Sequence, residues 1–210
     1  HKARFYDGGS WATLLARRGV VVLAPDVFTF GSRRLPVATL PNALRTRLQG
    51  LTPDTPAYID AANAIADDHE HLIAKTLFAA GATWPGVFAA EDRRALDVLA
   101  SLPGVDSDRL GCGGLSGGGL RTLFLAGLDD RVRAAVCVGF MTTLRELLPS
   151  KALEHTWMLY VPHLARALDL PDLVGLRAPA PLMVQFDTDD ELFTPAGQHD
   201  ANTLLRQTYA

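Results

Sequence analysis

Short runs of apolar residues alternate along the chain with longer stretches of helical periodicity. The apolar runs cover residues 20–25, 110–113, 132–139 and 181–186, and their continuous apolar character predicts buried strands. The helical stretches cover residues 9–18, 57–80, 86–102, 117–128 and 195–208. Strands that alternate with helices of this length are typical of βαβ units. The pattern therefore predicts an α/β fold with a mostly parallel, doubly wound sheet and right-handed crossovers.

Two segments depart from this alternation. Residues 29–54 are rich in Arg and Pro and show no clear period, and residues 141–177 read as short helices broken at Pro149, Pro162 and Pro171. Ligands of open α/β sheets bind beyond the carboxyl ends of the strands, where such insertions are placed to cover a site. We expect one domain over residues 1–210, with 141–177 as a cap-like insertion.

Composition narrows the class of protein. The 210 residues are 48% hydrophobic and 20% charged with a net charge of −3, which excludes a disordered chain and fits one core. The weak charge makes nucleic acid and membranes poor candidates for partners, and no apolar run reaches the roughly 18 residues of a spanning helix. Cys112 and Cys137 lie in apolar runs and are expected to be buried, reduced thiols. The compartment and the oligomeric state stay open.

A glycine-rich stretch after the second apolar run contains a candidate nucleophile. Residues 114–118 read Gly-Leu-Ser-Gly-Gly, a G-x-S-x-G pattern between a predicted strand and a predicted helix. In this setting the turn is strained and holds the serine Oγ above the sheet, at the positive end of the helix. Glycine is expected at positions 114 and 118 because a Cβ would clash in so tight a turn. Ser116 is the predicted nucleophile.

A phosphate-binding turn is the alternative for the same residues. Gly113 and Gly117 belong to a glycine-rich stretch that suits such a turn, but no Gly-Lys-Ser/Thr sequence follows them. An acidic partner for a ribose, expected about 20 positions further on, is also missing. Both absences favour the nucleophile.

The fourth apolar run leads into an acidic loop, which supplies a candidate for the acid that orients a catalytic histidine. That acid should follow a late strand, and Asp190 is our candidate. The neighbouring Asp187, Asp189 and Glu191 are expected to cap and solvate the loop. A calcium loop is the alternative, but Leu192 stands where such a loop requires glycine. We expect neither a metal nor a cofactor.

The histidine base is harder to assign. The six histidines are His1, His69, His71, His155, His163 and His199. Only His199 follows Asp190, and it lies within a predicted helix. His69 and His71 are two apart on a predicted helix and point in opposite directions, so they cannot share a metal. His155 and His163 fall in the covering insertion, where a structural or pocket-lining role is expected. The catalytic histidine is therefore expected beyond Ala210.

The expected oxyanion hole is also incomplete, in this case at the amino-terminal end of the chain. Its first donor is expected to be the backbone N–H of Gly117, which follows the nucleophile. The second normally comes from a loop after an earlier strand, and nothing before Ser10 resembles that strand. The chain is expected to be an internal piece of a longer protein.

With these residues the chain resembles the α/β-hydrolase superfamily, and within it the dienelactone-hydrolase-like and acetyl-xylan-esterase-like branch of bacterial esterases. The resemblance spans almost the whole chain and is carried by residues 24–26 with 30–34, 69–72 with 74–75, 92–97, 114–119 and 130–135. It implies Ser116 as nucleophile, Gly117 as oxyanion donor and Asp190 as acid, with Asp187 where the family usually has glycine. Dienelactone hydrolases use a cysteine nucleophile, so Ser116 argues against that activity.

The resemblance implies a serine carboxylic-ester hydrolase. The expected substrate is a short-acyl ester such as an acetyl ester of a carbohydrate or small alcohol, cleaved through an acyl-enzyme without a cofactor. The alternatives are a peptidase or thioesterase of the same fold and a catalytically silent binding module.

Overall fold

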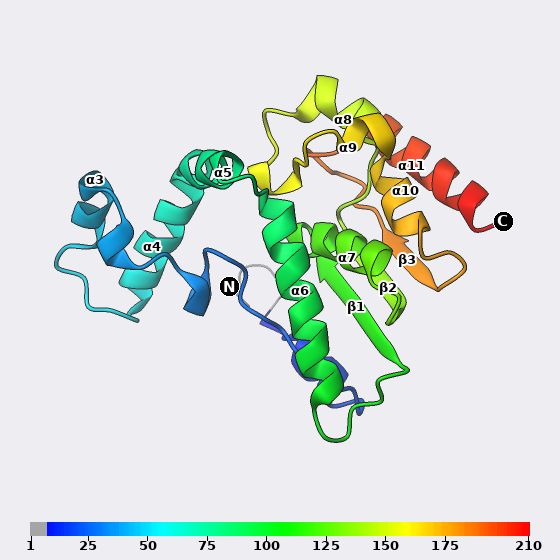
Figure 1. Cartoon of the computed structure of the whole chain (residues 1–210), viewed down its shortest axis with the longest axis horizontal. Coiled ribbons are helices and arrows are strands. Elements are labelled where there is room, and N and C mark those ends of the chain that lie inside the picture. The colour runs from blue at the N-terminus through cyan, green and yellow to red at the C-terminus, as the bar shows by residue number, and fades with distance from the viewer. Residues whose placement is uncertain (1–7) are drawn as a thin grey trace.

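The computed structural model describes residues 8–210 and contains a parallel sheet of three strands, built from the second half of the chain (Figure 1). The strands are β1 (Leu110–Leu115), β2 (Val132–Val138) and β3 (Leu182–Gln185), in the order β1-β2-β3. Gly113 pairs with Val136, which pairs in turn with Met183. The strands form at three of the predicted apolar runs, with β1 extending two residues past its run, and the predicted α/β class is confirmed.

The two connections between the strands differ in kind. Helix α7 (Gly117–Leu128) joins β1 to β2. The longer connection from β2 to β3 contains α8 (Leu144–Lys151), the 3₁₀ helix η4 (Trp157–Leu159), α9 (Leu164–Ala167) and α10 (Leu170–Gly175). Helix α11 (Pro195–Thr208) follows β3 and has the predicted bounds.

Helix α7 covers one face of the sheet and forms the centre of the core. It packs on β1 and β2, and α6 (Trp84–Ser101) and α10 pack on α7 in turn. Leu123 of α7, Cys137 of β2 and Leu170 of α10 are fully buried there. On the other face of the sheet, Leu115, Val136 and Met183 remain 37–53% exposed within the described chain.

The first predicted strand does not form. Residues 20–25 have no strand partner within residues 8–210, and the Val20, Val21 and Leu23 side chains are 39–48% exposed. An apolar run becomes a strand only where a neighbour completes its hydrogen-bond ladder. The preceding helix α2 (Trp11–Ala16) forms as predicted, with Ser10 as its N-cap.

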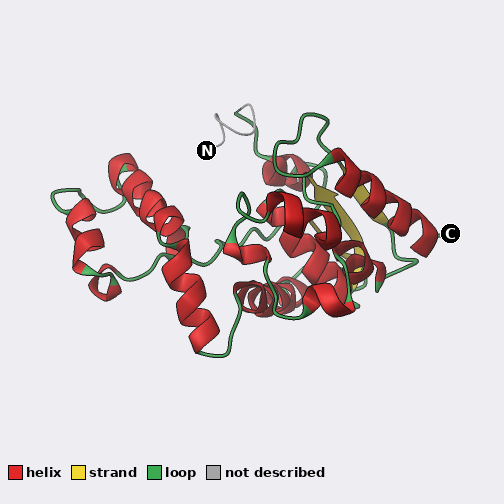
Figure 2. Ribbon diagram, turned by 90° about the horizontal axis from the view of Figure 1, so that it is seen from above, coloured by secondary structure: helices red, strands yellow, loops and turns green. Residues whose placement is uncertain are grey.

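Residues 31–68 build an arm that projects away from the sheet in both views (Figures 1 and 2). Its elements are η1 (Gly31–Arg33), η2 (Val37–Thr39), α3 (Asn42–Arg45), η3 (Thr46–Leu48) and α4 (Pro56–Asp68). Leu40, Leu44, Leu48 and Ile65 form a separate small apolar cluster in the arm.

The helix predicted over residues 57–80 is divided in two. Helix α4 ends at Asp68 and α5 (Glu70–Ala79) begins after His69, whose backbone is not helical (φ −113°, ψ 15°). The His69 ring nitrogen Nδ1 lies 3.1 Å from the carbonyl oxygen of Ile65, and this contact closes the last turn of α4. Helix α5 then contacts the covering insertion: Glu70 accepts a hydrogen bond from Thr156, and the His71 Nδ1 accepts one from the Trp157 indole at 2.7 Å.

Proline effects within the covering insertion were predicted only in part. Pro162 lies between η4 and α9, and Pro171 is in the first turn of α10, where its missing N–H costs nothing. Pro149 lies inside α8 and does not break it, so that predicted break is wrong. The helix continues through Pro149 and ends two residues later, at Lys151.

Within residues 8–210 no single helix is both long and apolar enough to cross a membrane. Helices α5 and α6 reach that length and composition only as a pair, and they are bent by 85° relative to each other.

Candidate active site

Ser116 lies in the turn between β1 and α7 with a strained backbone. Its φ of 54° and ψ of −119° are values that a residue with a side chain rarely adopts. Two hydrogen bonds hold the turn: the Ser116 N–H donates to the carbonyl of Val138 at 2.9 Å, and its carbonyl accepts from the N–H of Leu120 at 3.0 Å. The side chain is exposed at the carboxyl end of the sheet. This geometry is that of a nucleophile elbow.

Two glycines make this turn possible, and the pattern predicts only one of them, Gly114. A Cβ at Gly114 would lie 2.4 Å from the carbonyl carbon of Gly118, and one at Gly119 would lie 2.8 Å from the Cβ of Phe140. A Cβ at Gly118 would meet nothing within 4 Å, so the predicted clash at that position is wrong. Gly118 matters as a surface against which Gly114 packs.

Helix α7 presents its amino end to Ser116. Gly117 is the first residue of α7, and the first N–H groups of a helix have no acceptor within it. Such a group, with the helix dipole behind it, suits a developing oxyanion. On the next turn Arg121 donates to both carboxylate oxygens of Asp92, which is only 7% exposed, and this pair fixes α7 against α6.

Asp190 lies in the loop between β3 and α11 and is held by the backbone of its own loop. Its Oδ1 accepts hydrogen bonds from the N–H groups of Leu192, at 2.8 Å, and Phe193, at 3.1 Å. The amide of Gln198, on α11, lies 3.4 Å from Oδ2. One oxygen is therefore fixed by the loop, and the other has only a long contact.

The Asp187 carboxylate lies beside Gly139, at the carboxyl end of β2. A Cβ at Gly139, which has a φ of +58°, would lie 2.8 Å from the Asp187 Oδ2 and 3.4 Å from the Leu115 side chain. Gly139 follows β2, and Leu115 directly precedes Ser116. The Asp187 carboxylate thus lies at the carboxyl edge of the sheet, close to the elbow, which the sequence did not indicate.

Within residues 8–210 no histidine forms a hydrogen bond with Ser116 or Asp190. The His155 Nε2 contacts the carbonyl of Leu192 at 2.9 Å, whereas the His199 side chain is exposed on α11. His71 is engaged by Trp157, and His163 precedes α9 with a positive φ. His1 lies outside the described residues.

The described residues also contain no group of three or more His, Cys, Asp or Glu side chains arranged to hold a metal. Cys137 is fully buried and Cys112 is partly buried, both as free thiols. Burial raises the pKa of each thiol to about 12, so neither is a reactive thiolate. Of the two tryptophans beside these elements, Trp84 is 2% exposed and belongs to the core, whereas Trp157 is 41% exposed.

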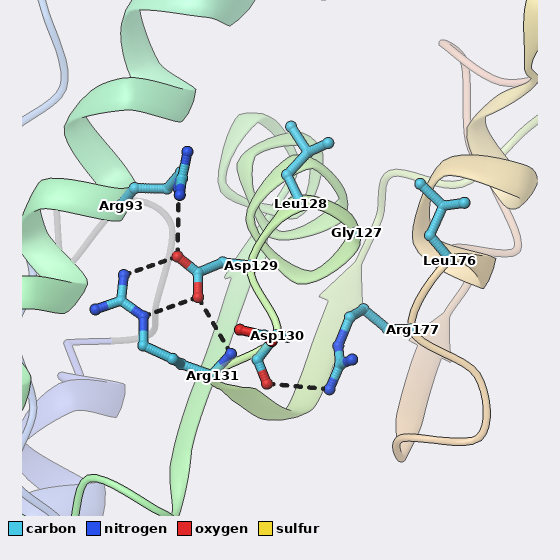
Figure 3. Close-up of a pocket in the computed structure, with 8 residues that line it drawn as sticks. All are labelled: Arg93, Gly127, Leu128, Asp129, Asp130, Arg131, Leu176 and Arg177. Carbon is cyan, nitrogen blue, oxygen red and sulfur yellow. Dashed lines mark hydrogen bonds and ion pairs between the residues drawn. The ribbon is translucent and has the colours of Figure 1, made fainter.

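A cavity of about 440 Å³ lies at the opposite end of α7 (Figure 3). Asp129 at the end of α7 accepts hydrogen bonds from Arg131 and Arg93, and Arg177 donates to the carbonyls of Asp130 and Val132. Hydrogen bonds from Arg131 hold the pKa of Asp129 at about 2. Asp129 is thus paired with two arginines and Arg177 is bound to main-chain carbonyls, and these contacts fasten the turn from α7 into β2, far along the helix from Ser116.

Sequence reasoning missed His155 and Gln198 as neighbours of the acidic loop. Gln198 lies one turn into α11, so a strand–loop–helix reading could have placed it near Asp190. His155 comes from a segment 37 positions away from Leu192, and no sequence pattern signals that contact.

No protein-family model matches the chain. Over 142 residues it is 30% identical to a Bacillus subtilis (strain 168) protein described as "Putative hydrolase YtaP", a match that covers 67% of this chain and 48% of that protein. A solved structure described as a "putative acetyl xylan esterase" from Bacteroides fragilis NCTC 9343 matches 94% of this chain and 46% of its own. The TM-score is 0.70 and the identity 18%. The chain thus spans about half the length of these relatives, and the structural match shows the fold.

Proposed function

We propose that this chain, which has the α/β-hydrolase fold, carries the nucleophile and the acid of a serine carboxylic-ester hydrolase. The observation that carries the proposal is the Ser116 turn, strained at φ 54°, exposed, and placed between β1 and the amino end of α7. Strain of this kind persists only where the surroundings enforce it, and it is concentrated at functional sites. The similarity to a protein described as a hydrolase supports the same class of activity.

In the proposed mechanism the Ser116 Oγ attacks the ester carbonyl while a histidine takes the hydroxyl proton. The carbonyl oxygen becomes an oxyanion, which the N–H of Gly117 stabilises together with a second donor. The intermediate collapses to an acyl-enzyme and the alcohol leaves with the proton from the imidazolium. Water, deprotonated by the same histidine, then attacks the acyl group and releases the carboxylic acid and Ser116.

Asp190 orients that histidine in our proposal. Its Oδ1 is fixed by two N–H groups, which leaves Oδ2 to accept a hydrogen bond from the imidazole. Because no histidine of residues 8–210 occupies this position, we place the base in a segment that follows Ala210. The second oxyanion donor is placed in a segment before Ser10. About half of the length of each relative lies outside its match to this chain.

The proposed substrate is a short-acyl ester, such as an acetyl ester of a carbohydrate or small alcohol. The structural neighbour described as an acetyl xylan esterase supports this choice. No cofactor or metal is needed for the proposed steps.

Labelling with a fluorophosphonate tests the proposal, because this reagent reacts with activated serines. We expect an adduct on Ser116 of the full protein, none in Ser116→Ala, and hydrolysis of an acetyl ester that falls by about 10⁴-fold or more in that variant. A preference for an aminoacyl amide or a thioester over the acetyl ester would favour a peptidase or thioesterase. Neither labelling nor turnover would indicate a silent binding module.

A further inference from the structure

His155, in the covering insertion, contacts the acidic loop through both its ring nitrogen and its ring face. The Nε2 lies 2.9 Å from the carbonyl oxygen of Leu192. A carbonyl oxygen only accepts, so Nε2 carries the proton and donates it. The imidazole also packs on the Phe193 ring, with centroids 4.7 Å apart and an interplanar angle of 31°.

The hydrogen bond from His155 reaches Asp190 through one peptide group. The carbonyl of Leu192, which accepts from His155, and the N–H of Phe193, which donates to the Asp190 Oδ1 at 3.1 Å, belong to the same peptide bond. A donor on the oxygen of an amide polarises the amide and strengthens the hydrogen bond that its N–H makes. His155, the Leu192–Phe193 peptide and Asp190 therefore form a continuous chain of hydrogen bonds.

The surroundings fix this peptide on its other side as well. Phe193 is 3% exposed and packs edge-on against Phe140, with ring centroids 5.0 Å apart. Phe140 is itself buried and follows the end of β2. The peptide is thus held between the sheet and the covering insertion, and His155 supplies the polar contact from the insertion.

From this geometry we propose that His155 is a positioning residue for Asp190. The inference rests on the proposed role of Asp190 as the acid that orients the catalytic histidine. His155 touches neither Ser116 nor Asp190 directly. It fixes the Leu192–Phe193 peptide, and that peptide fixes the Oδ1 of Asp190, so that Oδ2 is presented in one direction.

Two substitutions of His155 distinguish the contribution of its N–H donor from that of its aromatic ring. His155→Phe keeps an aromatic ring on Phe193 but has no N–H for Leu192. His155→Gln has no ring but can place an amide N–H near the position of Nε2. The exposed His199 on α11 offers a matched control, since His199→Phe makes the same chemical change away from the loop.

The first measurement is independent of any substrate. In the full protein, we expect the Phe193 amide proton to shift upfield in His155→Phe and its hydrogen exchange to become about two- to tenfold faster. His155→Gln should restore both values toward those of the wild type, and His199→Phe should leave them unchanged. An unchanged Phe193 amide in His155→Phe, or a glutamine variant that behaves like the phenylalanine variant, overturns the proposal.

The second measurement asks whether the positioning serves catalysis. His155→Phe should lower kcat for an acetyl ester by about three- to tenfold and leave KM unchanged, with recovery in His155→Gln. In an Asp190→Asn background the same substitution should have no further effect, because the residue that it positions is already disabled. An equal loss in both backgrounds would mean a purely structural role and would overturn the proposal.

The two measurements also separate this inference from the proposed function. If the Phe193 amide responds as expected while the wild type neither hydrolyses esters nor reacts with a fluorophosphonate, His155 positions Asp190 and the ester-hydrolase proposal fails. If the wild type is active and the Phe193 amide does not respond, the esterase proposal stands and the role of His155 is refuted.

Discussion

At Gly114 the fold leaves no room for a Cβ atom. The Cβ of an alanine would lie 2.4 Å from the backbone of Gly118, and backbone atoms cannot move aside as a flexible side chain can. We expect Gly114→Ala to lower the free energy of unfolding by about 1–3 kcal/mol, the usual cost of overpacking. Urea unfolding of the purified variant measures this loss.

Gly118→Ala is the matched control, because the same atom would meet nothing within 4 Å there. Gly118 lies in the first turn of α7, so alanine should leave the stability unchanged or raise it by up to about 1 kcal/mol. A loss in Gly118→Ala as large as that in Gly114→Ala would contradict this account of the elbow.

Asp190 supplies a second prediction for a single residue. Asparagine keeps the shape of the side chain but removes the charge that would stabilise an imidazolium. We expect Asp190→Asn to lower kcat by about 10⁴-fold, as such a change does in a catalytic triad, while the protein stays folded. Steady-state hydrolysis of an acetyl ester, together with circular dichroism, makes the measurement. A loss below tenfold would show that another residue supplies the acid.

At the level of elements, the turn from α7 into β2 depends on a charge that titrates. Asp129 is 5% exposed, and hydrogen bonds from Arg131 hold its pKa at about 2, below the ordinary value of 3.8. A carboxylate with a depressed pKa stabilises the fold above the pKa of the unfolded chain. That contribution disappears as the pH falls through the folded value.

We therefore expect Asp129→Asn to lose about 2 kcal/mol of stability at pH 7, and the gap from the wild type to narrow between about pH 4 and pH 2. Denaturant unfolding of both proteins over this pH range makes the measurement. A gap that stays constant down to pH 2 would exclude the proposed ion pairing as its cause.

The sequence predicted those helices and strands whose hydrophobic pattern is complete within the segment itself. The apolar runs of β1, β2 and β3 and the helical pattern of α11 are complete within each segment, and all four form close to the predicted positions. Residues 20–25 have the same composition as a strand, but a ladder requires a neighbour, and within the described residues they have none. Periodicity also does not reveal the division of one predicted helix at His69, after which Glu70 and His71 contact Thr156 and Trp157.

In the candidate site, too, the features built from consecutive residues could be predicted, and those built from distant contacts could not. Ser116 and Gly117 could be predicted because the elbow is built from consecutive residues, and Asp190 because it follows a recognisable strand. Those assignments stay predictions until a variant is tested. The position of Asp187 beside Gly139 and the contact of His155 with Leu192 arise only when distant segments fold together, so the sequence alone could not provide them.

At the scale of the whole molecule, the described residues have two apolar clusters. The larger surrounds α7, and the smaller contains Leu40, Leu44, Leu48 and Ile65 in the arm. Contacts from α5 to η4 and from α4 to α5, the Arg33–Glu91 ion pair, and Leu35, which packs on both clusters, connect the arm with the rest of the chain. Since each cluster has its own buried side chains, we expect the arm to open without unfolding of the sheet.

Two leucine truncations test that independence by hydrogen exchange. Leu44, in the arm, and Leu123, in α7, are 4% and 0% exposed, so each alanine variant removes a buried side chain. Leu44→Ala should speed exchange of amides in residues 42–68 and leave those of β1 and β2 unchanged. Leu123→Ala should cost about 2–5 kcal/mol and speed exchange in the strands, because its cavity opens where α7 packs on the sheet. Faster exchange in β1 and β2 of Leu44→Ala would instead show that arm and sheet unfold as one cooperative unit, through the contacts of α5 with the covering insertion.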